Sequence, residues 1–364
     1  MSKVLIIGGA GYIGSSLAER LIQDGHRVTI YDSLYHNQDS VQRLDHMLVN
    51  GISVSDALLQ NFNGSMRPRD FRFMQADIRD INSLKRIFAE EKFDYVFHLG
   101  ELVGHECCIR DTQAAESVNV AGTKNVVDLA LEHQVALIWN STSSVYGFRD
   151  NPGLLDETAV LPPADRLDEY SRRKLPGEEY IAHNADKNSD FRAIVLRPAT
   201  VGGLSPRMRL ELLPNHFTYS MMIGHLSLTD ANYYRAVIDI NDLVDAYAAI
   251  LNSGVWHNGV FNIGNYNMTK NQFADEISKA LEYDDSRVST SGGEKFRGDG
   301  RNLQISSAKF TQAFGFQPRR TLSGTVKSLV EILRRHPALF SSNGYRGSLN
   351  IPIKSFEEMC GIRN

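Results

Sequence analysis

A cluster of glycines between a short apolar run and an amphipathic helix constrains the fold of this chain more than any other feature. Val4 to Ile7 predicts a buried strand, and apolar residues at helical spacing follow the glycines. Arg27 to Tyr31 then predicts a second strand, which ends at Asp32. A strand, a tight turn, a helix and another strand in this order are typical of the first unit of a parallel sheet.

Short apolar runs continue to alternate with helical patterns as far as about residue 198. The further strands are expected near residues 71–75, 94–99, 136–140 and 192–196, and the helices near 118–133 and 170–182. Strands separated by helices predict the α/β class, with a Rossmann-like, doubly wound parallel sheet covered on both faces. The polar stretch 33–70 does not fit this alternation, and we interpret it as an insertion over the sheet edge.

After Pro198 the pattern loosens, because prolines and polar turns interrupt it. Helices are still expected at 269–283, where Thr269 and Gln272 form a capping box, and at about 323–335. A length of 364 residues suits two closely joined domains. We place the first over 1–198, with some later segments returning to it, and a smaller mixed α/β substrate-binding region over 199–364.

The glycines form a GxxGxxG pattern at Gly8, Gly11 and Gly14. One glycine permits the tight turn, one lets the backbone approach a pyrophosphate, and one lets helix and strand pack closely. The start of the helix, at Tyr12 and Ile13, offers free N–H groups to phosphates. Because the pattern follows a strand and opens a helix, it predicts a dinucleotide site over the first domain.

Two aspartates follow predicted strands and are candidates for the adenosine end of that dinucleotide. Asp32 lies 18 residues after Gly14, where a carboxylate accepts hydrogen bonds from ribose hydroxyls and repels a 2′-phosphate. NAD is therefore favoured over NADP, although a turn cap without a ligand is the alternative. Asp77 either faces the adenine or lies in a surface turn.

Tyr170 and Lys174 form a YxxxK pair that shares one face of a helix. A tyrosine, with an unperturbed pKa of about 10, is a poor base. We expect the lysine ammonium to lower that pKa, so that the phenolate can take a proton from a sugar hydroxyl while hydride leaves for a nicotinamide. The hydroxyls of 141–144 follow a strand, where ligands bind in such sheets. A helix surface and a Ser/Thr-rich turn are the alternatives.

Together these motifs resemble the extended short-chain dehydrogenase/reductases, the NAD-dependent epimerase/dehydratase family of nucleotide sugars. The resemblance covers most of the chain, and the order of the motifs is more specific than any one of them. It is carried by the glycine motif at 8–14, Asp32, Asp77-Ile78, His98-Leu99-Gly100, Asn119, the turn ending in Val145-Tyr146-Gly147, Tyr170 and Lys174, and Arg197-Pro198, with weaker similarity at 235–242, 261–264 and 297–299.

The resemblance implies roles for individual residues. Tyr170 is the expected general base, Lys174 binds the nicotinamide ribose, Thr142 is the catalytic hydroxyl, and Asn119 orders the lysine and a water molecule. Two arginines are expected on the substrate diphosphate, which a guanidinium binds bidentately. The other expected cofactor contacts are Ile78, Leu99, Gly100, Ser141 and Pro198, and the expected substrate contacts are His105, Cys107, Thr142, Ser144, Asn215, Arg235 and Arg301.

Two departures from the family pattern bear on the reaction. The 4,6-dehydratases have Asp-Glu after the catalytic threonine, whereas this chain has Ser143 and Ser144, which fit an epimerase better. The family usually has Ala-Ala after His-Leu, whereas this chain has a glycine and then Glu101, with His105 and Cys107 close behind. Any of these three could exchange protons next to a 4-keto group. Loop packing is the alternative.

We therefore predict an NAD-dependent epimerase of nucleotide-diphosphate sugars, in which C4 is oxidised and the same NAD returns the hydride. A dehydratase or decarboxylase with the same 4-keto intermediate, a net dehydrogenase or reductase, and a non-catalytic NAD-binding regulator are the alternatives. The family also implies a homodimer through the helices near 118–133 and 170–183.

Composition excludes several other classes of protein. The net charge is −4, with 39 basic against 43 acidic residues, so nothing recruits a nucleic acid or an anionic membrane. The three cysteines, Cys107, Cys108 and Cys360, show no metal-ligand spacing, so no metal is expected. Because no apolar run is long enough for a signal peptide or a membrane span, we expect a cytoplasmic protein with free thiols.

Overall fold

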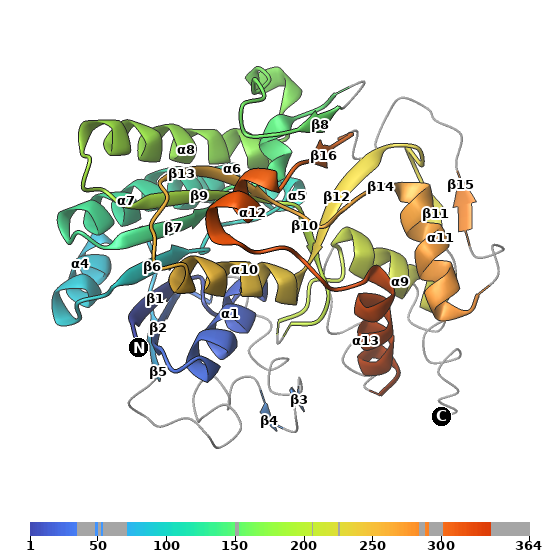
Figure 1. The fold of residues 1–364 in the computed structure, drawn as a ribbon, viewed down its shortest axis with the longest axis horizontal. Helices are drawn as coiled ribbons and strands as arrows, with labels where there is room; N and C mark the ends of the chain where they lie inside the picture. Colours follow the sequence, from blue (N-terminus) through green and yellow to red (C-terminus); the bar gives the residue numbers. More distant parts are fainter. Residues whose placement is uncertain are drawn as a thin grey trace.

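The computed structural model describes residues 1–34, 48–49, 52–53, 71–149, 153–205, 207–224, 226–283, 288–290 and 301–335. Most of the segment interpreted as an insertion, the motif at 297–299 and Cys360 lie outside these residues. A parallel sheet flanked by helices forms one part of the molecule, and a smaller group of strands and helices from the second half of the chain lies beside it (Figure 1).

The central sheet has seven strands, in the order β13-β9-β7-β6-β1-β2-β5, and all the neighbouring strands are parallel. β1 lies between β2 and β6, so the chain leaves it in opposite directions and opens a crevice at the carboxyl ends of these strands. The strands are β1 (Lys3–Ile7), β2 (Arg27–Asp32), β5 (Phe71–Gln75), β6 (Tyr95–His98), β7 (Ala136–Asn140), β9 (Ala193–Pro198) and β13 (Gly259–Ile263).

Helices cover both faces of this sheet, which confirms the predicted doubly wound fold. Along β1, Val4 and Ile6 pack in the apolar cluster with α1, α10 and α12, whereas Leu5 and Ile7 pack in the cluster with α4, α7 and α8. The helices are α1 (Tyr12–Gln23), α4 (Ile81–Glu90), α7 (Thr123–Glu132), α8 (Glu169–Lys187), α10 (Ile240–Asn252) and α12 (Ala308–Phe314).

The segment expected to be one helix over 118–133 is interrupted. Its first part is a π-helical turn, η3 (Ser117–Gly122), and regular α-helix begins only with α7 at Thr123. Two short helices, α5 (His105–Arg110) and α6 (Thr112–Glu116), precede the turn. π-helical turns are frequent at functional sites.

The smaller part is mixed α/β, as predicted, and has its own apolar cluster. α11 begins with the predicted capping box: Thr269 accepts from the Gln272 amide at 3.2 Å, and the Gln272 side chain accepts from the Thr269 amide at 2.8 Å. The remaining elements are β3 (Leu48–Val49), β4 (Ile52–Ser53), η4 (Ser143–Tyr146), β8 (Leu154–Leu155), η5 (Ala164–Arg166), β10 (Thr200–Gly202), α9 (Leu213–Ile223), β11 (Leu226–Leu228), β12 (Tyr234–Asp239), β14 (Tyr266–Thr269), α11 (Lys270–Leu281), β15 (Val288–Thr290), β16 (Gln304–Ile305) and α13 (Leu322–Arg335).

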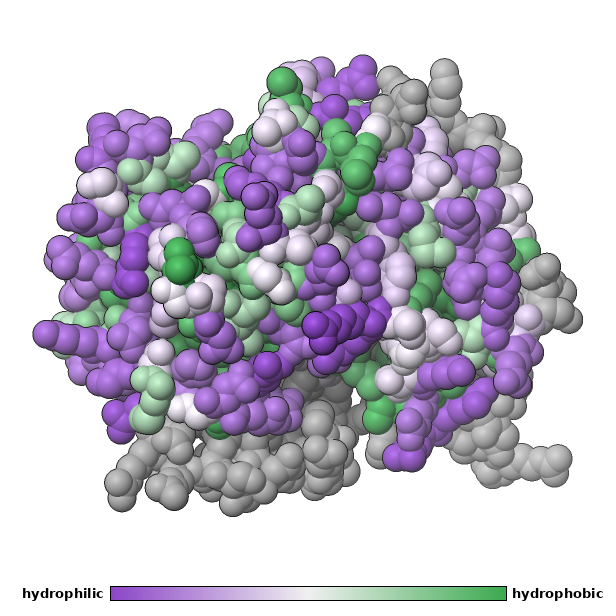
Figure 2. Space-filling view, in the orientation of Figure 1, coloured by the Kyte–Doolittle hydropathy of each residue, from purple (hydrophilic) through white to green (hydrophobic). Residues whose placement is uncertain are grey.

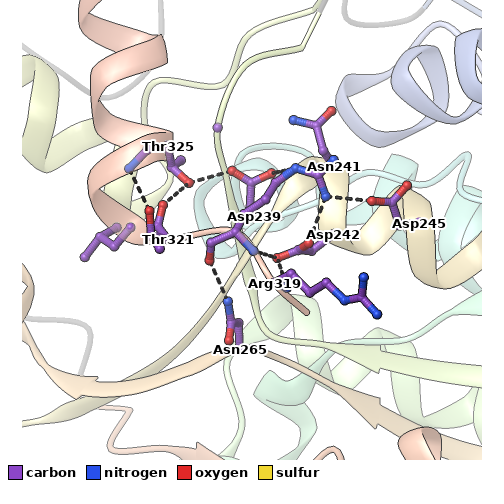
Figure 3. A network of polar contacts seen from close by, with 12 residues as sticks. Asp239, Asn241, Asp242, Asp245, Asn265, Arg319, Thr321 and Thr325 are labelled. Carbon is purple, nitrogen blue, oxygen red and sulfur yellow. Dashed lines mark hydrogen bonds and ion pairs between the residues drawn. The ribbon is translucent and has the colours of Figure 1, made fainter. Parts of the chain in front are cut away.

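A polar network joins α10 to the start of α13 (Figure 3). Asp239 caps α10 and accepts a hydrogen bond from Thr325 at 2.6 Å. Arg320 pairs with Asp242 at 2.8 Å and with Asp245 at 2.6 Å. Since these aspartates lie at or near the start of the helix that covers the central sheet, the network fixes the smaller part against that sheet.

The surface drawn in Figure 2 is largely hydrophilic, with small and separate apolar areas. Within the described ranges, no helix combines the length and the apolar character that a membrane span requires.

Candidate active site

A cavity of about 520 Å³ lies at the carboxyl ends of the central strands, between the sheet and the smaller part. Residues from both parts of the molecule line it. Of the residues predicted from the sequence, those lining it are Gly8, Gly11, Tyr12, Ile13, Gly14, Asp32, Asp77, Ile78, Leu99, Gly100, Glu101, His105, Ser141, Thr142, Ser143, Ser144, Tyr170, Lys174, Pro198, Arg235 and Arg301.

The glycine turn is compact enough to exclude any side chain at two positions. Gly8 has a φ of +80°, and a Cβ there would lie 2.5 Å from the Cα atom of Gly100. A Cβ on Gly14 would lie 2.2 Å from the Gly8 carbonyl oxygen. Gly11 precedes α1 and has no side chain to cap it, so the first N–H groups of the helix are left for an anion. The turn therefore fits the pyrophosphate of a dinucleotide.

Asp32 is anchored at the end of β2 by the backbone around it. Its two carboxylate oxygens accept hydrogen bonds from the Ala10 amide at 2.9 Å and the Leu34 amide at 2.8 Å. Burial raises the pKa of Asp32. Each oxygen keeps a second lone pair, so the carboxylate can still accept from ribose hydroxyls. Asp77 also lines the cavity, but its carboxylate pairs with Arg79 at 2.6 Å.

Tyr170 and Lys174 lie one turn apart on α8 and both face the cavity. Asp168 caps this helix by accepting from the Ser171 amide at 2.7 Å. Thr142 also lines the cavity and caps η4, its hydroxyl oxygen accepting from the Ser144 amide at 3.1 Å. The Thr142 hydroxyl proton is therefore free for another acceptor. The cavity brings together a phenol, an ammonium group and a hydroxyl.

The expectation that Lys174 lowers the pKa of Tyr170 is wrong for this arrangement. The pKa of Tyr170 lies well above its ordinary value, first because the phenol is buried and second because the negative charge of Glu101 is close. Glu101 forms an ion pair with Lys174, so its negative charge largely cancels the effect of the ammonium charge on the pKa of the phenol.

Asn119 does not contact the lysine, contrary to prediction, and does not line the cavity. It is fully buried in η3, where its amide oxygen accepts from the Leu102 amide at 2.8 Å and its amide nitrogen donates to the Leu102 carbonyl at 2.8 Å. Both hydrogen-bonding groups of its side chain are thus committed to the loop after β6. The role of Asn119 is to hold that loop.

Two predicted substrate contacts also lie away from the cavity lining. Asn215 is fully buried and bridges the Gly203 amide at 2.8 Å and the Arg209 carbonyl at 2.9 Å. Cys107 packs against the apolar cluster on the α7 and α8 side. Neither residue lines the cavity, because the Asn215 side chain is hydrogen-bonded to the backbone and the Cys107 side chain packs against apolar residues.

Three basic residues that line the cavity, Arg207, Arg209 and Lys270, were not predicted from the sequence, whereas Arg235 and Arg301 were. Arg207 and Arg209 lie between β10 and α9, in a segment that looked like a polar turn. Lys270 begins α11, and its ammonium donates to the Thr229 carbonyl at 2.9 Å. Arg301 lies 3.3 Å from Asp168 and hydrogen-bonds Ser144. Together with Arg235 these residues give the substrate side a positive lining suited to a diphosphate.

Comparison with known proteins agrees with this geometry. The sequence profile of the NAD dependent epimerase/dehydratase family matches residues 4–264. A probable UDP-arabinose 4-epimerase of Arabidopsis thaliana is 29% identical over 288 residues, which are 72% of this chain and 64% of that protein. A UDP-glucose 4-epimerase of Neisseria meningitidis is 29% identical over 198 residues, 54% of this chain and 52% of that protein. The chain thus matches less than two thirds of the length of these curated relatives.

Solved structures show the same fold at lower identity. A UDP-glucose-4-epimerase from Stenotrophomonas maltophila has a TM-score of 0.76 at 21% identity, covering 93% of this chain and 99% of that one. A dTDP-glucose 4,6-dehydratase from Bacillus anthracis has a TM-score of 0.74 at 19% identity, covering 93% of this chain and 98% of that one. A 4-epimerase and a 4,6-dehydratase share this architecture, so the fold alone does not determine the reaction.

Proposed function

This chain belongs to the NAD-dependent epimerase/dehydratase family, and from that premise we propose that it inverts C4 of a nucleotide-diphosphate sugar through a transient 4-keto intermediate. The observation that carries the proposal is one cavity lined by Tyr170, Lys174, Thr142, the glycine turn and several basic side chains. The glycine turn and Asp32 would hold NAD. When bound, NAD would accept a hydride from the sugar and return the same hydride to it.

Three residues of the chain would then act on the sugar and the cofactor, each in a different role. In its phenolate form, which the positive charge of bound NAD⁺ would favour, the Tyr170 oxygen takes the proton of the C4 hydroxyl as that carbon is oxidised, and it gives the proton back when the keto group is reduced. Thr142 donates its free hydroxyl proton to the same sugar oxygen. Lys174 holds the nicotinamide ribose. Inversion requires the keto sugar to turn over before reduction, while the diphosphate stays bound to the arginines.

Inversion fits the cavity better than elimination does. Elimination needs an acid beside the sugar to protonate the leaving hydroxyl. The residues after Thr142 are Ser143 and Ser144, which are not acids, and Ser144 accepts a hydrogen bond from Arg301. Glu101 is buried in an ion pair with Lys174. A 4-keto sugar in this cavity is therefore more readily reduced than dehydrated.

Proton NMR of the purified protein with a panel of UDP-, dTDP- and GDP-sugars in deuterated water tests this function. The expected result is a C4 epimer without deuterium at C3 or C5 and without net NADH absorbance. Net formation of NADH would instead indicate a dehydrogenase. Deuterium at C3 or C5 would indicate an epimerase that acts on another carbon, and a product that has lost water would indicate a dehydratase. No turnover of any sugar would contradict the proposal.

Replacing Arg301 by alanine should raise KM for the nucleotide sugar by about 10–100-fold and change kcat much less. A charge-assisted hydrogen bond contributes about 1.5–3 kcal/mol, and a diphosphate stays bound throughout the reaction. Steady-state kinetics check this expectation. Arg72→Ala, which removes an arginine paired with Glu90 on the surface, is the control. An equal fall in kcat with unchanged KM would argue against diphosphate binding by Arg301.

The protein should bind NAD at least about 100-fold more tightly than NADP. A 2′-phosphate brought next to the ionised Asp32 would meet a like charge, and each factor of ten corresponds to about 1.4 kcal/mol. Isothermal titration calorimetry with both dinucleotides measures the ratio. Asp32→Asn should reduce the ratio of the NAD affinity to the NADP affinity, mainly by weakening NAD binding. Equal affinity of the unaltered protein for both would exclude Asp32 from the ribose site.

We further propose a cytoplasmic homodimer that serves carbohydrate biosynthesis. The described cysteines, Cys107 and Cys108, are free thiols, which suits a reducing compartment. The dimer is expected through α7 and α8, which run along the same face of the sheet (Figure 1). Light scattering coupled to size-exclusion chromatography measures the oligomeric state.

A further inference from the structure

The loop after β6 places the carboxylate of Glu101 in the buried interior, next to Lys174 of the Tyr170–Lys174 pair. The side chain of Glu101 is 1% exposed. One of its oxygens accepts hydrogen bonds from the Trp139 indole at 2.7 Å and the Thr123 hydroxyl at 3.1 Å, and the other pairs with the Lys174 ammonium. A buried carboxylate is costly unless it is paired and hydrogen-bonded, and here it is both.

The contacts of Lys174 are correspondingly specific. An ammonium group has three N–H donors. One donates to the Asn140 carbonyl at the end of β7, and Glu101 lies close enough to take another. The nitrogen also lies 4.6 Å from the centre of the Trp139 ring. One donor is therefore left for a ligand in the cavity, and its direction is set by the other two.

The backbone around Glu101 is fixed from both sides. The Leu99 amide donates to the Ile7 carbonyl at 2.8 Å, and Gly100 is in close contact with Gly8 of the glycine turn. On the other side Asn119 binds both backbone groups of Leu102. The backbone that carries Glu101 is thus held between the dinucleotide turn and η3, and this fixes where the carboxylate enters the interior.

We propose that Glu101 is a positioning residue, the fixed counter-ion that keeps Lys174 charged and aims its remaining N–H at the nicotinamide ribose. The same charge opposes the effect of the lysine on Tyr170. This inference rests on the proposed function, since it assigns Lys174 and Tyr170 to the reaction. It also accounts for the departure at Glu101 from the family's usual alanine.

The other ionisable groups near Glu101 and Lys174 do not change the charges of this ion pair. Burial lowers the pKa of His98 to about 3, so the imidazole beside Glu101 stays neutral, and burial raises the pKa of Cys108 to about 12. Glu178 is paired with Arg197 at 2.5 Å. The groups facing the pair, by element, are His98 on β6, Cys108 on α5, Tyr170 and Glu178 on α8, Asp168 before α8, and Arg209 before α9.

Trp139 provides a readout of the pair that does not depend on turnover. It touches both charges, and the chain has only one other tryptophan, Trp256, which lies away from the cavity lining and hydrogen-bonds Asn258. In a Trp256→Phe background, the emission maximum of Trp139 should therefore report the charge of Lys174 as the pH is raised.

Glu101→Gln in that background should move the pH-dependent change in Trp139 emission to lower pH. Burial lowers the pKa of Lys174 and Glu101 opposes that shift, so without the carboxylate the lysine should lose its proton at lower pH than in the unaltered pair. The double variant Glu101→Gln/Lys174→Met should lack this change, and since it removes both charges it also shows that the fold tolerates the change. Glu90→Gln, on the surface, is the control. A change in Glu101→Gln at the same pH as in the unaltered pair would overturn the proposal.

The pH profile of kcat/KM gives the second readout. In Glu101→Gln, kcat/KM should begin to fall at lower pH than in the unaltered protein, because Lys174 then loses at lower pH the proton with which it would bind the nicotinamide ribose. A fall at unchanged pH would contradict the inference. Absence of turnover with every sugar would reject the proposed function instead, while the Trp139 titration would still decide the state of the ion pair.

Discussion

Tyr170→Phe should lower kcat by about 10²–10⁴-fold with little change in NAD affinity, the range expected when one general acid–base group is removed. The substitution removes only the phenolic oxygen, which lies in the cavity together with Thr142 and Lys174. The ring remains to pack against the apolar cluster under α8. Steady-state kinetics with the nucleotide sugar identified by NMR, and calorimetric titration with NAD, measure the two effects.

Tyr180→Phe is the matched control for this experiment. Tyr180 lies on the same helix, and its hydroxyl donates to Asp128 at 2.6 Å on the surface, away from the cavity lining. Its replacement should leave kcat within about twofold, because surface substitutions of this kind have small effects. If Tyr170→Phe retained more than about a tenth of the activity, the phenol could not be the group that exchanges the sugar proton.

Gly14→Ala should weaken NAD binding by about 100-fold or more, the effect of misplacing a binding group by about 1 Å. The added Cβ would lie 2.2 Å from the Gly8 carbonyl oxygen and 2.7 Å from the Gly9 Cα atom. Both obstacles are backbone, so the start of α1 must move away from the turn. Overpacking of this kind also costs about 1–3 kcal/mol of stability.

Gly153→Ala is the control for the glycine experiment, since a Cβ at that exposed position meets nothing within 4 Å. Thermal unfolding separates loss of the fold from loss of the site. A Gly14→Ala protein that unfolds slightly earlier but no longer binds NAD is the expected result. Unchanged NAD affinity would remove the pyrophosphate from the glycine turn.

The elements that the sequence predicted well are those whose pattern is decided locally. β7 has the predicted bounds because a buried central strand is a nearly continuous apolar run. β5 also has the predicted bounds, and its apolar residues are interspersed with polar ones because it lies at the edge of the sheet. The capping box of α11 is likewise a local signal. β13 was not predicted as a strand, because its run begins with a glycine, contains the polar Asn262, and has only partly buried residues at its first two positions. Its pattern is therefore weaker.

The same distinction between local patterns and contacts across the fold applies to the candidate site. Motif spacing placed Tyr170, Lys174 and the glycine turn on one cavity, because their positions follow from the order of strands in the sheet. What surrounds Lys174 depends on contacts across the fold, from Glu101 after β6 to Trp139 on β7. Spacing along the chain contains no such information, so the sign of the pKa shift of Tyr170 was predicted incorrectly.

The position of β13 has a consequence for how the protein is made. β9 ends at residue 198, but its outer neighbour is supplied by residues 259–263. While a ribosome synthesises the residues between them, at about 5–20 residues per second, the backbone amides and carbonyls along the outside of β9 have no strand to bind. Such an open edge can be captured by another nascent chain. Yield in a cell should therefore depend on how quickly translation passes through residues 199–258.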